Sequence, residues 1–149
     1  MHADAPYRSL ALNLIISGIV MYLAMFSMIW SLGEFYNNLN TFYIVLMMVA
    51  PMGILMLLLM APMHPNRRLN LALHFAFVVL FAAGLIGMRQ QSLIGDRQFL
   101  RSMIPHHSGA ILMCERADLR DLEIKALCAN IARSQAAEIG QMKRILARL

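Results

Sequence analysis

Charged residues are scarce in this 149-residue chain, at 14%, whereas typical globular domains carry about a quarter. The scarcity lies in the first 88 residues, whose only charged side chains are Asp4, Arg8, Glu34, Arg67 and Arg68. Hydrophobic residues make up 60% of the chain, which excludes an ordinary soluble domain for this region. All other charges lie from Arg89 onward, so the chain divides into a lipid-soluble part and a water-soluble part.

Cysteine is also rare, because Cys114 and Cys128 are the only two and form no C-x-x-C pair. This spacing excludes zinc-ribbon and thioredoxin-like motifs. The chain has no phosphate-binding loop and no Ser-His-Asp set, and it lacks the Glu-x-x-His pairs of a ferritin-like di-iron site. We therefore expect no enzyme. The first apolar stretch is too long for a cleaved signal peptide, and no small-residue cleavage site follows it.

Three charge-poor stretches are each long enough to cross a bilayer, which takes about 20 helical residues. They cover about 9–32, 41–60 and 69–88 and predict a transmembrane domain over 1–90. Pro51 predicts a kink in the second stretch. Gly84 and Gly87 predict a close helix contact near the end of the third.

The arginines predict the orientation in the membrane. Arg8, Arg67 and Arg68 flank the spans on the N-terminal side, so the positive-inside rule places the N-terminus in the cytoplasm. The C-terminal part is then periplasmic or extracellular, on a bacterial inner membrane, although three arginines on that side count against this orientation. The net charge of +5 is scattered, which favours contact with anionic lipid headgroups over nucleic acid.

Residues 91–149 show a different pattern. Apolar residues recur at helical spacing from Phe99 to Cys114 and again from Ile124 to Leu146, which predicts two amphipathic helices. Asp96 and Asp121 are their expected N-caps. A short turn between such helices predicts an antiparallel hairpin. The fold class is therefore an all-α membrane protein, with three transmembrane helices followed by an amphipathic helical hairpin.

The run Met103-Ile104-Pro105-His106-His107 is the sharpest local feature of the hairpin. Pro105 predicts a break in the helix there. Imidazole suits copper, zinc or iron, whereas a thioether selects for Cu(I). Ideal antiparallel packing brings this run near Glu138 and Met142, so these residues predict one metal site. The alternative is an exposed, capped helix break that binds nothing.

The same register lets Cys114 approach Cys128. A disulfide requires Cα atoms within about 7 Å and fits an oxidising location outside the cytoplasm. Free buried thiols and metal-bound thiolates remain open as alternatives.

Two runs resemble one known family. FLRSMIPHHSGAILM, residues 99–113, and SQAAEIGQM, residues 134–142, are similar to the signature of domain-of-unknown-function family 305. The resemblance implies a ferritin-like four-helix bundle, with some members binding copper in the periplasm. Carried over by position, it implies as ligands Met103, His106, His107, Met113 and Met142. Glu138, which the packing brings near this run, would be an outer partner of these ligands. One hairpin is half of such a bundle, so we expect a homo-oligomer formed through the hairpins, a dimer or, in a transporter, a trimer. The alternative is a hairpin that packs on the membrane part of its own chain.

Methionines recur every four residues along the second span, at Met48, Met52, Met56 and Met60. Three spans with this stripe loosely resemble the Ctr-type copper transporters, which are trimers. Stacked thioethers predict a path for Cu(I), and His74 in the third span is a functional candidate beside them. The alternatives are ordinary methionine packing and a neutral His74 bonded to a neighbouring helix.

Three hypotheses for function follow. The first is a membrane-anchored protein whose hairpin captures or sequesters copper, as Cu(I) or Cu(II). The second is a copper transporter or channel that uses the methionine stripes. The third is a structural membrane protein in which the hairpin only drives oligomerisation and no metal is bound.

Overall fold

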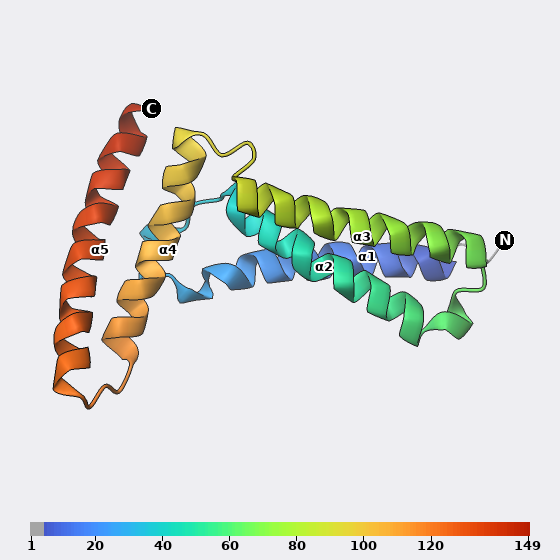
Figure 1. The fold of residues 1–149 in the computed structure, drawn as a ribbon, viewed down its shortest axis with the longest axis horizontal. Coiled ribbons are helices and arrows are strands. Elements are labelled where there is room, and N and C mark those ends of the chain that lie inside the picture. Colours follow the sequence, from blue (N-terminus) through green and yellow to red (C-terminus); the bar gives the residue numbers. More distant parts are fainter. Residues whose placement is uncertain (1–4) are drawn as a thin grey trace. The chain divides into compact units, whose positions relative to one another are not determined.

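The computed structural model describes residues 5–149, and all regular structure in that range is helical. The chain forms two compact units. The span unit consists of the chain up to Ala24 together with Asn40–Leu93, and the hairpin unit consists of Met25–Leu39 together with Ile94–Leu149. Figure 1 shows the helices of both units.

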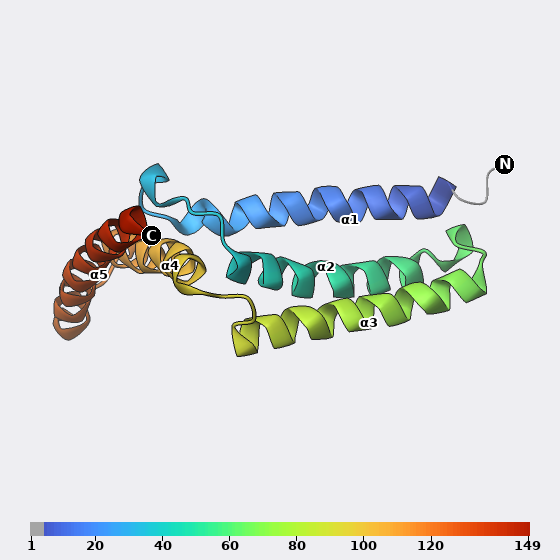
Figure 2. The same cartoon turned by 90° about the horizontal axis from the view of Figure 1, so that it is seen from above.

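The span unit is built from three long helices, α1 (Ala5–Ala24), α2 (Leu39–Leu59) and α3 (Arg67–Gln90), which Figure 2 shows running alongside one another. Each of the three is long and apolar enough to span a membrane, with the first span extending through the 3-10 helix that follows α1. In each helix, no more than 22% of the most apolar 18-residue segment is buried within the protein. The remaining apolar surface faces outward, as expected of helices solvated by lipid.

The helix ends differ from the predicted ones in one important place. The first span was expected to reach residue 32, but α1 stops at Ala24 and a 3-10 helix covers Met25–Met28. The structure groups Met25–Leu39 with the hairpin, whereas composition alone put these residues in the transmembrane domain. The physical reason is that this segment packs against α4 (Asp96–Arg116) of the hairpin, where Phe26 and Glu34 are buried.

The α2–α3 contact depends on glycine. A Cβ at Gly84 would lie 3.0 Å from the backbone oxygen of Tyr43, and one at Gly87 would lie 2.8 Å from the Tyr43 ring. The predicted close helix contact is therefore confirmed. Pro51 lies inside a continuous α2. One small core joins all three helices: Leu10 and Leu14 of α1 and Leu57 of α2 are buried in it, and Leu73 and Phe77 of α3 pack against them.

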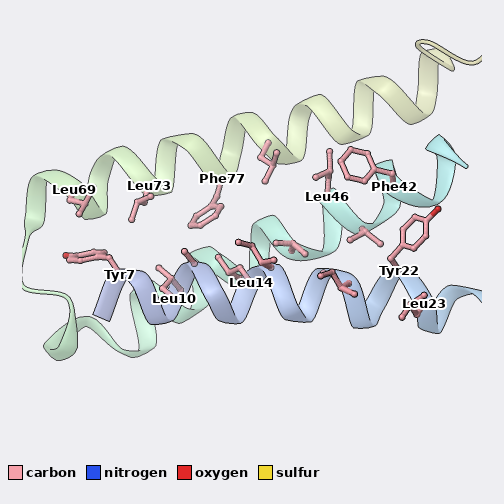
Figure 3. Close-up of a pocket in the computed structure, with 17 residues that line it drawn as sticks. Tyr7, Leu10, Leu14, Tyr22, Leu23, Phe42, Leu46, Leu69, Leu73 and Phe77 are labelled. Atoms are coloured by element: carbon pink, nitrogen blue, oxygen red, sulfur yellow. The ribbon is translucent and has the colours of Figure 1, made fainter. Parts of the chain in front are cut away.

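An apolar hollow of about 690 Å³ lies within the span unit, and Figure 3 shows its lining side chains on all three helices. Tyr7 and Tyr22 supply the only hydroxyl groups of this lining, and neither a charged residue nor a methionine takes part. The hollow therefore offers no chemistry for a metal, and it is separate from the predicted methionine path.

The hairpin unit contains α4 (Asp96–Arg116) and α5 (Leu122–Arg148), which lie side by side in Figures 1 and 2. Their shared core consists of Leu100, Ile104, Ile111, Ile139 and Met142. The predicted amphipathic hairpin is present, because the apolar stripes of both helices meet in this core.

The N-cap of α5 is as predicted, whereas that of α4 is not. The Asp121 carboxylate accepts hydrogen bonds from the backbone N–H groups of Glu123 and Ile124, at 2.8 and 3.0 Å. Gly95 is the N-cap of α4, and Asp96 is its first helical residue instead of its cap. A carboxylate in the first turn still interacts favourably with the helix dipole.

The predicted break at Pro105 is absent, because α4 continues through it from Asp96 to Arg116. Proline removes a single backbone hydrogen bond. Ile104, which has no exposed surface, and Ile111 hold the helix against its neighbours on both sides of the proline. His106 and His107 are therefore consecutive residues of a regular helix, about 100° apart around its axis.

Residues Met25–Leu39 give the hairpin a third layer. Phe26 is buried and its ring lies 4.3 Å from that of Phe35, and Tyr36 packs against the core of the hairpin. The backbone N–H of Leu39 donates to the side-chain oxygen of Gln98 at 3.1 Å. The lone hairpin thus gains part of its missing core from its own chain.

Candidate metal-binding site of the hairpin

His107 is the best-defined chemical group of the hairpin. It is buried, with 8% of its surface exposed. Its Nδ1 lies 2.9 Å from the Met103 carbonyl oxygen one turn earlier on α4, and its Nε2 lies 2.8 Å from Oε2 of Glu138 on α5. A carbonyl oxygen can only accept, so Nδ1 carries a proton and donates it. Nε2 is thereby directed at a carboxylate across the helix seam.

Glu138 is the partner of this imidazole. The Ser134 hydroxyl donates to its other oxygen, Oε1, at 2.7 Å. The hydrogen bond from Ser134, and after it the one from His107, lowers the pKa of Glu138 below its usual value of 4.5. The carboxyl group is therefore negatively charged at neutral pH, although its side chain is 47% exposed to solvent.

This geometry requires a cation between the two side chains. With Nδ1 protonated, a neutral imidazole directs the lone pair of Nε2 at a carboxylate oxygen, and two acceptors at 2.8 Å repel each other. Either a second proton on Nε2 or a metal ion removes the repulsion. The His107–Glu138 pair is thus a site for a proton or a metal cation.

The other predicted ligands lie at different distances from this pair. The exposed His106 ring lies with its centroid 6.0 Å from that of His107. Met103 is half-buried and packs against the apolar core that contains Met142. Met113 is 55% exposed and lies about 9 Å further along the helix axis than His107, so the structure does not bring it to the pair.

Within residues 5–149, no group of three or more His, Cys, Asp or Glu side chains is arranged to hold a metal ion. A metal at His107 and Glu138 would therefore take its remaining ligands from His106, from thioethers, from water or from another chain. The nearby thioethers of Met103 and Met142 match the first of these possibilities.

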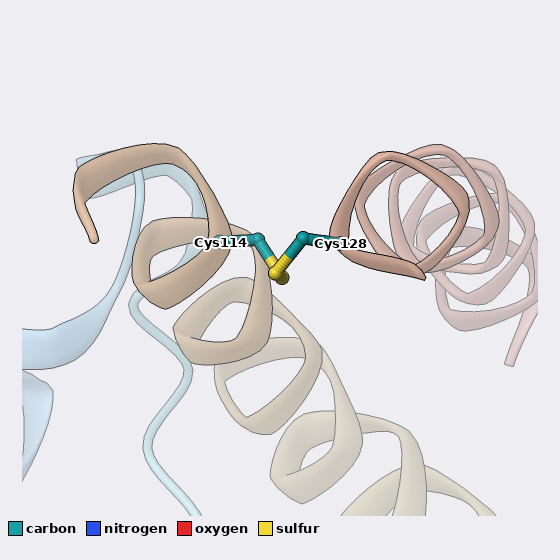
Figure 4. Close-up of a disulfide and its surroundings, with 2 residues drawn as sticks. All are labelled: Cys114 and Cys128. Carbon is teal, nitrogen blue, oxygen red and sulfur yellow. A yellow bond between two sulfur atoms is a disulfide. The ribbon is translucent and has the colours of Figure 1, made fainter. Parts of the chain in front are cut away.

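Cys114 and Cys128 form a disulfide that links α4 to α5, with their Cα atoms 5.2 Å apart (Figure 4). Both thiols are consumed, so the alternatives of free thiols and metal-bound thiolates do not describe this structure. Closing a loop of this length stabilises a fold by about 3 kcal/mol in the chain-entropy model.

A buried polar network went unpredicted. Glu34 is 8% exposed, and its Oε2 accepts hydrogen bonds from the Ser108 hydroxyl and the Ser31 N–H, while Oε1 lies 3.6 Å from Nζ of Lys143. Ser108 Oγ also accepts from the Trp30 N–H at 2.6 Å. The network fastens Met25–Leu39 to both helices. Its signal in the sequence was a single glutamate, Glu34, in a charge-poor stretch.

The four methionines of the predicted stripe do not share one environment. Met52 and Met56 pack against the core around Leu57, whereas Met48 and Met60 are 44% and 38% exposed. The predicted membrane path stays a prediction. His74, the histidine predicted to lie beside this path, is half-buried on α3. Its Nδ1 lies 2.7 Å from the Asn70 carbonyl oxygen.

The architecture defines a class first: a helical hairpin on a chain with three helices able to span a membrane. The comparisons then define the family, because residues 85–147 match the family described as Domain of unknown function (DUF305). An uncharacterized protein of Acanthamoeba polyphaga mimivirus is 36% identical over 118 residues, covering 78% of this chain and 76% of the viral one. The chain belongs to this family.

The aligned length also exceeds the 85–147 region, so the likeness extends outside the hairpin. No solved structure matches the chain.

Proposed function

We propose that this protein is a membrane-anchored copper-binding protein that captures or sequesters copper at the hairpin. The observation that carries the proposal is the His107–Glu138 pair, with Nε2 and Oε2 2.8 Å apart. Two ligands at right angles, each about 2 Å from a metal, have this separation. Metal-binding histidines typically donate their other ring N–H to a carbonyl or carboxylate, as His107 does to Met103.

The neighbouring side chains favour copper over other metals. Met103 and Met142 offer thioethers in the same part of the hairpin, and His106 offers a second imidazole. Thioether sulfur selects for Cu(I), whereas imidazole accepts both oxidation states of copper. Buried Met142 has to turn toward the metal, which its unbranched side chain allows. The resemblance to family members that bind copper supports the same choice.

The proposed location is the outer face of a bacterial inner membrane, with the lipid bilayer around the three apolar helices. The proposed oligomer forms through the hairpins, because α5 leaves three large apolar side chains strongly exposed: Leu122, Ile124 and Leu127. A ferritin-like bundle would be completed by a second copy of the hairpin.

The test is copper analysis of the full chain, purified in detergent, loaded with copper and freed of excess. We expect the double variant His106→Ala/His107→Ala to lose the copper bound at the hairpin, because both imidazoles are removed. Met113→Leu is the matched control and should bind as the wild type does, since Met113 lies apart from the pair.

Unchanged copper content in the histidine variant would refute the hairpin site. Oligomers that stay intact under chelator, together with no copper bound, would favour the structural alternative, in which His107 and Glu138 are only an ion pair.

A further inference from the structure

Two imidazole nitrogens of the span unit are buried without a partner. Nε2 of His64 and Nε2 of His74 are among only three such side-chain atoms in residues 5–149, the third being Nε of Arg101. His64 itself is 5% exposed. Buried polar atoms are nearly always paired, so two unpaired imidazole nitrogens ten positions apart in the chain point to a bound ligand.

Both histidines present a lone pair at Nε2. Nδ1 of His64 lies 3.0 Å from the Met60 carbonyl oxygen, and Nδ1 of His74 lies 2.7 Å from the Asn70 carbonyl oxygen. A carbonyl cannot donate, so each Nδ1 carries the proton and each neutral ring leaves Nε2 free to bind. His107 has the same bond to the carbonyl four residues before it.

Asn70 connects the two histidines. Its side-chain nitrogen donates to the His64 carbonyl oxygen at 2.8 Å, and its side-chain oxygen accepts from the Tyr7 hydroxyl at 2.8 Å. The Tyr7 ring also packs edge-on against the His64 ring, with centroids 5.0 Å apart. His74 lies one turn after Asn70 on the same face of α3. Asn70 therefore contacts the backbone of His64 and the imidazole of His74, at the end of the span unit where α1 and α3 begin.

The charge and donor types of this region select the ligand. The described part of the span unit contains no Asp or Glu, and Arg67 and Arg68 begin α3 near His64. Sites for divalent cations such as Ca²⁺ and Mg²⁺ usually include carboxylate ligands, and the described part of the span unit has none. Met56 packs in the same core as Tyr7 and brings a thioether to this end of the unit. Neutral nitrogen and sulfur donors suit monovalent Cu(I).

We propose that His64 and His74 form a second metal site, in the span unit, that binds Cu(I). The site goes beyond the hairpin site and rests on the proposed function only for the identity of the metal.

The experiment measures Cu(I) bound by the full chain in detergent, without oxygen, in competition with the chromophoric chelator bicinchoninate. The starting chain carries His106→Ala/His107→Ala, which removes the hairpin site. We expect it to retain one copper per chain, and His64→Asn/His74→Asn to remove that copper. Asparagine keeps a donor near the position of Nδ1 but has no Nε2. Met63→Leu, at an exposed neighbour of His64, is the control and should change nothing.

The reverse combination separates the two proposals. Asparagine at positions 64 and 74 with an intact hairpin should remove the span copper and leave the hairpin copper. Copper that persists in the starting chain after both asparagine substitutions would overturn the second site, whatever the hairpin does.

A measurement on the unmodified histidines guards against misfolded variants. In the starting chain labelled with ¹⁵N-histidine, Cu(I) should shift the Nε2 resonances of His64 and His74 and leave their Nδ1 resonances protonated. Nε2 resonances that do not move with added Cu(I) would equally overturn the proposal.

Discussion

Glu138 acquires its properties from two neighbours on different helices. Ser134 lies one turn before it on α5, and His107 reaches it from α4. Both hydrogen bonds favour the charged carboxylate, which is why the pKa of Glu138 lies below its usual value. A lowered pKa means that the stabilisation from this carboxylate is present above the unfolded-state pKa and is lost as the pH falls through the folded-state pKa.

Ser134→Ala should raise the pKa of Glu138 toward its usual value, because the Ser134 hydroxyl makes the largest contribution to the shift. The acid loss of the His107–Glu138 contact should then begin at higher pH. The measurement is an NMR titration of the Glu138 side-chain carboxyl carbon. Ser102→Ala is the control, since Ser102 donates to the Gln98 carbonyl oxygen on α4. A titration curve that does not move would show that Ser134 does not stabilise the charged carboxylate.

At the scale of elements, two kinds of helix pairing hold the molecule together. The hairpin helices meet through an apolar core and a disulfide between Cys114 and Cys128. In the span unit, α2 and α3 instead approach through glycines, as helices in membranes commonly do. Close packing of this kind is sensitive to a single added methyl group.

Gly84→Ala should destabilise the span unit by about 1–3 kcal/mol, the usual cost of overpacking, because the new methyl group meets the backbone oxygen of Tyr43 at 3.0 Å. Gly18→Ala is the matched control, because its methyl group meets only side chains, those of Val49 at 3.4 Å and Val45 at 3.8 Å. Thermal unfolding in detergent should give a lower Tm for the first variant only. Equal Tm values would contradict the close α2–α3 contact.

At the scale of the whole molecule, much apolar surface has no partner within the chain. Large side chains along all three span helices are exposed, which a lipid bilayer explains. The exposed apolar residues of α5 lie in the amphipathic hairpin, and we propose that a second hairpin covers them. An exposed apolar patch on a water-facing helix typically marks an interface.

Leu122→Glu/Leu127→Glu should convert a dimer into a monomer, because two carboxylates would be buried against a like copy. The measurement is the protein mass of the full chain in detergent by light scattering, which should fall by half. Ala147→Glu, exposed near the end of α5, is the control and should leave the mass unchanged. A wild-type mass of one chain, or a mass unaffected by the double substitution, would count against pairing through this face.

Several features of the protein follow from the sequence by itself. Three uncharged stretches suffice for three long apolar helices, because length and composition are local properties. Helical spacing of apolar residues likewise predicts the hairpin, and ideal packing brought Cys114 opposite Cys128. The same packing brought the run from Met103 to His107 near Glu138, which is the actual partner of His107. Periodicity determines which face of a helix is buried but leaves the register of two helices uncertain by about a turn.

Only the tertiary structure decided the rest. Helix α4 runs through Pro105 because packing on both sides outweighs one lost backbone hydrogen bond. Residues Met25–Leu39 join the hairpin because Glu34 accepts a hydrogen bond from Ser108 and pairs with Lys143, both of which are far away in the chain. A charge in an apolar stretch is stable only where distant partners satisfy it, and local sequence does not reveal those partners. The burial of His64 and the lack of a partner for its Nε2 arise in the same way, from contacts made only when the chain is folded.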